Sequence, residues 1–172
     1  MLKAIKKKMK DQRGLTLVEL LAVVVILGII SAIAVPSIGG LIDNSKKDAH
    51  VGNAQQMVNA AKMAVTADQS LLEEGDKYLT LKYLMTENFL DEIEDPDNGT
   101  YKIGGSDTVL ESPPAADVSY VVVNEGKVKS VKLINAERGV HTSGNPVAIS
   151  DLNRSAVNDI PAAPKDTDGT QD

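Results

Sequence analysis

Apolar residues fill one uninterrupted stretch near the start of the chain. Between Leu15 and Val35 a single residue, Glu19, carries a charge. A helix of about 20 apolar residues spans the hydrocarbon core of a bilayer, and a segment in lipid must satisfy its backbone hydrogen bonds internally. The pattern therefore predicts a membrane-spanning helix, in which the small residues Gly28 and Ser31 allow a neighbouring helix to approach closely.

Residues 41–74 show a different pattern, with apolar residues at steps of three and four. This spacing predicts an amphipathic helix whose apolar stripe needs a partner layer. The stripe comprises Ala54, Met57, Val58, Ala61, Ala64, Val65, Leu71 and Leu72. Because many of these side chains are small, we expect a sheet to pack closely on this helix. Gly75 is the candidate residue for its end.

Pro36 lies between the two patterns, with Gly39 and Gly40 close behind it. Proline removes one helical N–H and clashes with the preceding turn, and glycine weakens a helix further. Two interpretations remain open. Either one long helix has a flexible joint here, which we favour, or the first helix ends and a second one starts after Asp43 or Asn44.

The rest of the chain predicts a small head with mixed structure. We expect a second helix over 80–93, a turn at 95–99, and strands at 100–103, 118–123, 128–134 and near 147–149. Residues 124–127 can turn the chain between two of these strands, which predicts a hairpin. The predicted fold class is α+β, with three or four antiparallel strands laid on the second half of the long helix.

Charge is distributed unevenly. Residues 1–14 contain six basic residues and one acidic residue, whereas the remainder contains 12 basic and 23 acidic residues. A basic start before an apolar run is typical of membrane targeting. The acidic remainder argues against nucleic-acid binding, because phosphate would be repelled. The chain has no cysteine, which excludes disulfides and thiolate metal sites.

Three fates are open to the apolar segment. It can remain as an uncleaved anchor, it can be a secretory signal cut after Ala34, or it can be cut before the apolar run and stay in the mature protein. The charge of Glu19 argues against an ordinary signal, because a carboxylate in a membrane helix costs about 2.5 kcal/mol or more. Glu19 either reaches water at the interface or finds a positive partner in an assembly, such as an α-amino group created by nearby cleavage.

Residues 13–21, which read RGLTLVELL, resemble the leader junction of type IV pilins and the related pseudopilins. In that family a prepilin peptidase cuts after the glycine of a short basic leader and methylates the new N-terminus. The resemblance implies cleavage between Gly14 and Leu15 and N-methylation of Leu15. It also implies that Glu19 pairs with the terminal amine of a neighbouring subunit, and it places Thr16 in the same assembly segment. Pro36 matches a proline common in these helices. Leu15 departs from the usual phenylalanine but is also apolar, so cleavage is still expected.

The resemblance implies a structural subunit that polymerises into a type IV pilus used for attachment, aggregation or twitching motility. The partners it implies are copies of the chain, the prepilin peptidase, the membrane before assembly and, indirectly, the assembly platform and its ATPase. No cofactor and no direct contact with nucleic acid are expected. The subunit would be a single-pass membrane protein first and part of an extracellular filament afterwards.

The expected organisation follows from these patterns and the resemblance. A basic leader over 1–14 is removed, an apolar assembly helix covers 15–40, and an amphipathic helix continues over 41–74. An α/β head covers 75–157, and a polar tail covers 158–172.

Two alternatives stay open. One is a pseudopilin of a type II secretion or DNA-uptake machine, which would use the same leader and helix. The other is a secreted binding domain that begins at Val35, after an ordinary signal peptide.

Other candidate chemistry is sparse. His50 and His141 lie in no metal-binding spacing, so we expect both imidazoles to face solvent. One acidic run is a candidate for calcium, but it lacks the spacing of an EF-hand loop and is expected to be a solvated face: Glu87, Asp91, Glu92, Glu94, Asp95 and Asp97. No nucleophile motif is present, so no enzyme is predicted. Asn98 and Asn153 each begin a glycosylation triplet, to which we assign no modification.

Overall fold

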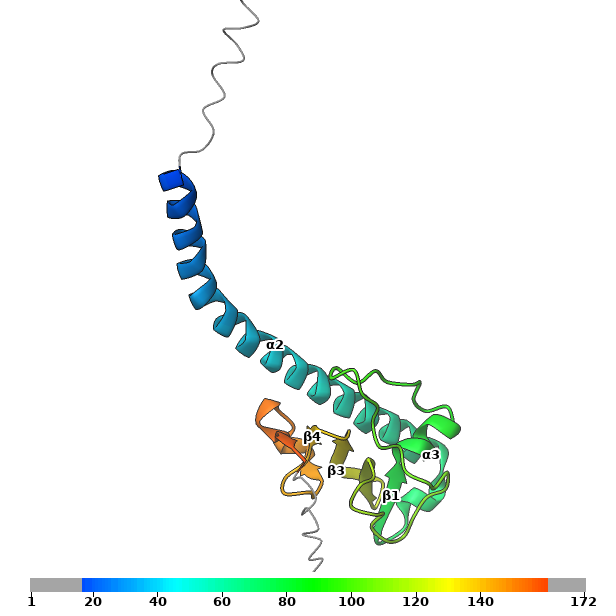
Figure 1. The fold of residues 1–172 in the computed structure, drawn as a ribbon. Coiled ribbons are helices and arrows are strands. Elements are labelled where there is room, and N and C mark those ends of the chain that lie inside the picture. The colour runs from blue at the N-terminus through cyan, green and yellow to red at the C-terminus, as the bar shows by residue number, and fades with distance from the viewer. Residues whose placement is uncertain (1–16, 161–172) are drawn as a thin grey trace, which may run out of the picture. The chain divides into compact units, whose positions relative to one another are not determined.

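Figure 1 shows the computed structural model of the chain, which describes residues 17–160. The chain divides into two units, residues 1–43 and residues 44–172. In the first unit the described residues form helix alone. The second unit contains the remainder of that helix, one short α-helix, three 3-10 helices and a sheet. The helix, α2, spans Leu17–Ala67.

Pro36 lies inside α2, which continues on both sides of it. The alternative interpretation, in which one helix ends here and another starts after Asp43 or Asn44, is therefore wrong, and the single long helix that we favoured is present. A proline removes a single helical hydrogen bond, and the long helical segments on either side maintain the helix. The flexible joint at Pro36 stays a prediction.

The long helix ends earlier than the stripe of apolar residues predicts. Asp68 follows Ala67, and its side chain accepts a hydrogen bond from the backbone N–H of Ser70 at 2.9 Å. This local bond competes with the helical ladder and starts a 3-10 helix, η1 (Gln69–Leu72). Gly75 does not end the long helix. It lies after η1 with φ of 101°, where the chain turns into the first strand.

Six antiparallel strands form the sheet within residues 17–160, rather than the three or four predicted. They are β1 (Asp76–Thr80), β2 (Tyr120–Asn124), β3 (Lys127–Ile134), β4 (Arg138–Val140), β5 (Val147–Ala148) and β6 (Val157–Asp159). The strand order is β1-β2-β3-β4-β6, and β5 pairs with β3. Strand β6 covers the first residues of the predicted tail, so the sheet extends to Asp159. Residues 161–172 lie outside the described residues.

The hairpin predicted from residues 118–134 is confirmed. Strands β2 and β3 pair antiparallel, with Val121 opposite Val131. Glu125 and Gly126 join them and both have positive φ, 48° and 71°. Two consecutive left-handed residues form the kind of tight turn that matches the twist of the flanking strands. The short strand predicted near residue 147 is also present, as β5.

Two local predictions are wrong. The second helix, α3, covers only Leu81–Thr86 instead of 80–93. The Thr80 hydroxyl caps its start by accepting from the Tyr83 N–H at 3.0 Å, and Asn88, with φ of 58°, lies beyond its end. Residues 100–103 form no strand. Lys102 instead bonds through its backbone to Ile134 and Ser119, each at 2.8 Å. Two further 3-10 turns, η2 (Ile149–Asp151) and η3 (Arg154–Ala156), complete the fold.

The core of the second unit lies between α2 and one face of the sheet (Figure 1). The predicted stripe supplies the helix side, where five residues are fully buried: Ala54, Met57, Val58, Ala61 and Ala64. The sheet side is aliphatic and equally buried: Leu79, Val121, Val123, Val131 and Leu133. Alanine at three of the five helix positions lets the sheet approach closely, as the stripe predicted, and the α+β fold class is confirmed.

Candidate functional site

The first unit exposes its apolar side chains. Every Leu, Ile and Val between Leu17 and Ile42 has between 46% and 82% of its surface exposed. Helix α2 is long and apolar enough to cross a membrane, and none of its most apolar window is buried within the chain. A helix that is apolar on all sides needs lipid or other protein around it. This surface, which we call the apolar helix, is defined as residues 17–42.

Glu19 lies in the first turn of α2 and is exposed among apolar neighbours. A carboxylate near a helix N-terminus is favoured by the positive end of the helix dipole. Of the residues predicted for cleavage and assembly, Gly14, Leu15 and Thr16 lie outside the described residues. Their roles stay predictions.

A buried polar network lies in the second unit, where the sequence predicted a solvent-exposed imidazole. His50 is fully buried on α2. Its Nδ1 lies 2.8 Å from the Tyr101 hydroxyl, and its Nε2 lies 2.8 Å from Oδ2 of Asp97. Asn53 Nδ2 donates to the same hydroxyl at 2.9 Å. All of these bonds are satisfied when Tyr101 donates to Nδ1 and the imidazole donates its Nε2 proton to Asp97.

The expectation of a solvated His50 was wrong because its bonding partners come from a distant loop. They lie 47 and 51 residues further along the chain. Burial raises the pKa of the Tyr101 phenol above its usual value, against the effect of the hydrogen bond from Asn53. The phenol is thus held protonated as a donor rather than activated as a nucleophile.

Asp97 lies at the centre of this network. Arg138 on β4 binds it with two parallel bonds, Nε to Oδ2 at 2.7 Å and Nη2 to Oδ1 at 2.6 Å. Lys46 on α2 reaches Oδ1 at 3.3 Å. The Arg138 guanidinium holds the pKa of the Asp97 carboxyl well below its usual range, and His50 and Lys46 act in the same direction. The network therefore links α2, the 95–101 loop and β4.

Asp95 completes the network from the same loop. Asn135 Nδ2 donates to its two carboxylate oxygens at 3.0 and 2.8 Å. The expectation of a solvated acidic face is wrong for Asp95 and Asp97, whose side chains are 1% and 4% exposed. It holds for Glu87, Asp91, Glu92 and Glu94, which are exposed.

A metal ion has candidate ligands here, because His50, Asp95 and Asp97 each offer one atom within 4.8 Å of the others. The donor set does not favour one. Arg138 and Lys46 both pair with Asp97, and both oxygens of Asp95 accept from Asn135. An ion would have to displace these partners, and calcium also requires six to eight oxygen ligands.

His141 is also buried rather than solvated, which corrects the second imidazole prediction. Its Nδ1 accepts from the Gly144 N–H at 3.1 Å. Its Nε2 has no hydrogen-bond partner among the described residues. Burial lowers the pKa of His141, and the charge of Lys132 lowers it further. No pattern in the sequence predicted this burial, because His141 follows a strand of only three residues.

Comparison with known proteins decides the family. The model of the prokaryotic N-terminal methylation motif matches residues 9–35. The chain is 31% identical to the type IV major fimbrial protein FimA of Dichelobacter nodosus over 137 aligned residues. The aligned region covers 80% of this chain and 74% of that protein. The chain belongs to the type IV pilin family. No solved structure matches this pilin.

Membership of the family agrees with the resemblance found at residues 13–21. Type IV pilins are structural subunits rather than enzymes, and the family implies polymerisation into a filament. The motif match includes Gly14, Leu15, Thr16 and Glu19 and ends one residue before Pro36. It gives no separate role for any of these residues.

Sequence reasoning missed the polar network of this pilin, although one signal was available. His50 lies four residues before Ala54 and so falls on the buried stripe of α2. A polar residue on such a stripe needs a buried partner. The partner could not be predicted from the sequence, because Tyr101, Asp97 and Arg138 come from irregular or very short elements.

Proposed function

We propose that the chain is a pilus subunit whose leader is cut after Gly14, whose Leu15 is then N-methylated, and whose apolar helix packs with copies of itself in a type IV pilus. One observation carries the proposal. The apolar helix contributes nothing to the core of its own chain, because its most apolar window has no buried residues.

The physical argument concerns what covers this helix. Before assembly the bilayer supplies an apolar surrounding of the right thickness. When a subunit leaves the bilayer, only another apolar surface can replace the lipid. Parallel copies of the same helix supply that surface, and the small residues Gly28 and Ser31 let them approach. Head-to-tail contacts that do not close into a ring then build a helical filament.

Glu19 gives this packing a register. A carboxylate among apolar helices is tolerated where an opposite charge reaches it. Cleavage after Gly14 would create an amine at Leu15, four residues from Glu19, and a neighbouring subunit could bring its own amine to the same depth. Thr16 would lie in the same contact layer. Assembly would therefore depend on processing, because the amine does not exist before the cut.

The motif match over 9–35 supports retention of the apolar helix rather than its removal as a signal peptide. A pseudopilin stays the second candidate, since it would carry the same leader and helix. The similarity to a major fimbrial protein over most of the chain favours the pilus.

Mass spectrometry of the exported protein tests the proposal. We expect a mature N-terminus at methylated Leu15, recovered from filaments seen by electron microscopy at the cell surface. A mature protein beginning at Val35 would refute the assembly model, because the apolar helix would be gone. Short filaments confined to the cell envelope would instead support the pseudopilin.

A further inference from the structure

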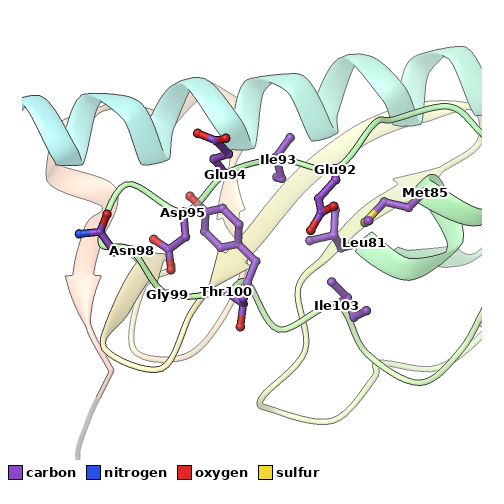
Figure 2. A pocket seen from close by; sticks show the side chains of 11 residues that line it. Leu81, Met85, Glu92, Ile93, Glu94, Asp95, Asn98, Gly99, Thr100 and Ile103 are labelled. Atoms are coloured by element: carbon purple, nitrogen blue, oxygen red, sulfur yellow. The ribbon is translucent and has the colours of Figure 1, made fainter.

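A hollow of about 880 Å³ opens on the second unit between α3 and residues 92–103. Its apolar lining comes from Leu81, Met85, Ile93 and Ile103, and Glu92 and Glu94 also line it. The Glu94 carboxylate points toward α2 (Figure 2). We call this the acidic pocket. In Figure 2 the Glu92 side chain extends from its segment toward Leu81. The pocket thus combines an apolar floor with negative charge, a combination that suits a cation on an apolar stem.

The charge of the acidic pocket is not balanced within the described part of the chain. Residues 83–101 contain no basic residue. Neither Glu92 nor Glu94 forms an ion pair between residues 17 and 160. This contrasts with Asp97, which lies a few residues further on and pairs with Arg138 and Lys46.

The cations available to fill such a pocket can be found by elimination. Within residues 17–160, Arg138 and Arg154 are paired with Asp97 and Asp48. Lys77 binds Glu111, Lys132 binds the Ala116 carbonyl, and Lys82 binds the Gly105 carbonyl. Lys46 and Lys47 also have interactions. The described lysines that remain are Lys62, Lys102, Lys127 and Lys129.

Two of these four lysines lie together. Lys127 and Lys129 are both exposed at the start of β3, next to the hairpin turn. Side chains two residues apart on a strand point to the same face, about 7 Å apart. The hairpin end is held in place, because the Gly126 N–H donates to the Leu71 carbonyl at 2.9 Å. Lys62 and Lys102 are single charges on other elements.

We propose that the acidic pocket receives Lys127 and Lys129 from a second copy of the chain. This inference rests on the proposed polymerisation and names one contact between heads. The two complementary surfaces belong to different parts of the same molecule, so each copy can offer its lysines to one neighbour and its pocket to another. Such a heterologous contact builds an open filament when its rotation does not close into a ring. The aliphatic stems of the lysines would cover the apolar floor while the ammonium groups meet Glu92 and Glu94.

Charge exchange tests the contact in full-length subunits expressed in the native assembly system. The variant Glu92→Lys/Glu94→Lys places like charges at every contact, and Lys127→Glu/Lys129→Glu does the same from the other side. We expect each to lose filaments. The variant with all four changes restores opposite charges in reversed order, and we expect its filaments to return. Lys62→Glu/Lys102→Glu is the matched control and should leave filaments intact.

Recovery in the fourfold variant also shows that the loss in each double variant is not a folding defect. Carbodiimide coupling of wild-type filaments gives a second measurement, because it joins a carboxylate directly to an amine. We expect peptides that link Glu92 or Glu94 to Lys127 or Lys129 in products of dimer size. Normal filaments from either double variant, or links from the pocket to Lys62 or Lys102 instead, would overturn the contact. Absence of filaments from the wild-type chain would instead refute the proposed function itself.

Discussion

Arg138 binds both carboxylate oxygens of Asp97, at 2.7 and 2.6 Å, in a site where the Asp97 side chain is 4% exposed. A bidentate pair of this kind is strong and directional. Because His50 on α2 bonds to the same carboxylate, the pair fixes the 95–101 loop between the helix and β4. The stability of the second unit should therefore depend on it.

Removing one partner should be costly, because it leaves the other charge buried. We expect Arg138→Met to lower the free energy of unfolding by about 3–5 kcal/mol. Denaturant unfolding of the full chain in detergent, followed by circular dichroism, measures this. The control is Arg154→Met, which breaks the exposed pair with Asp48 and should change stability little. Equal losses in the two variants would contradict a special role for the Asp97 pair.

The same pair predicts an acid-sensitive fold. The pKa of Asp97 is depressed in the folded protein. In acid, the Asp97 carboxyl of the unfolded chain therefore binds a proton at a pH where that of the folded chain stays ionised. Stability from this group is present above the ordinary aspartate pKa of about 3.9 and is lost as pH falls below it. We expect the unfolding free energy to drop on acidification more steeply in the wild type than in Asp97→Asn. Parallel pH profiles for the two proteins would contradict this.

From the four tyrosines we expect the folding stability to fall at alkaline pH. Burial raises the pKa of Tyr78, Tyr83, Tyr101 and Tyr120 alike. A raised pKa adds stability that is present below the unfolded value of about 10 and is lost as pH rises past it. Phenolate absorbance should therefore appear only above the pH at which free tyrosine ionises, and together with unfolding. Tyr101→Phe should unfold at lower denaturant, since Asn53 and His50 lose their partner.

Calcium should leave the stability unchanged. The two buried carboxylates already bind Arg138, Lys46 and Asn135, so an ion would gain ligands only by breaking these bonds. We expect the same Tm with calcium and with a chelator. A rise in Tm with calcium that disappears in Asp95→Asn would show that the network rearranges to hold the ion.

Sequence pattern predicted the parts of this fold that depend on local periodicity. The alanine-rich stripe, the apolar helix and the Glu125-Gly126 hairpin each follow from a spacing or a turn preference within a few residues. Strands β4 and β6 were missed because they have three residues each, too few for an alternating pattern to be visible. The helix predicted over 80–93 had the right periodicity, but only its first turns form.

The buried network could not be predicted from local sequence patterns. The bonded pairs in it that join different elements lie 38 to 51 positions apart in the chain. Each member is also polar, which predicts exposure when a residue is taken alone. Burial of Asp97 becomes favourable only when Arg138 and His50 are placed beside it. That condition depends on tertiary structure, not on the neighbours of Asp97 in the chain.

Substitutions at Glu19 should affect assembly without affecting folding. It lies in the first unit, whereas the core lies wholly in the second, so Glu19→Ala should leave the unfolding transition of the head unchanged. We expect this variant to be cut after Gly14 and methylated normally, yet to form no filaments, because the amine of a neighbouring Leu15 loses its partner. Glu19→Gln should fail as well, since it keeps the shape but not the charge.

Mass spectrometry of the N-terminus and electron microscopy of sheared cell-surface material together read out this test. Glu74→Ala, which removes an exposed carboxylate from the second unit, is the control and should assemble normally. Abundant filaments from Glu19→Gln would exclude charge pairing and leave Glu19 as a residue that only reaches water before assembly. Loss of cleavage in Glu19→Ala would place its role in recognition by the peptidase, one step earlier than proposed.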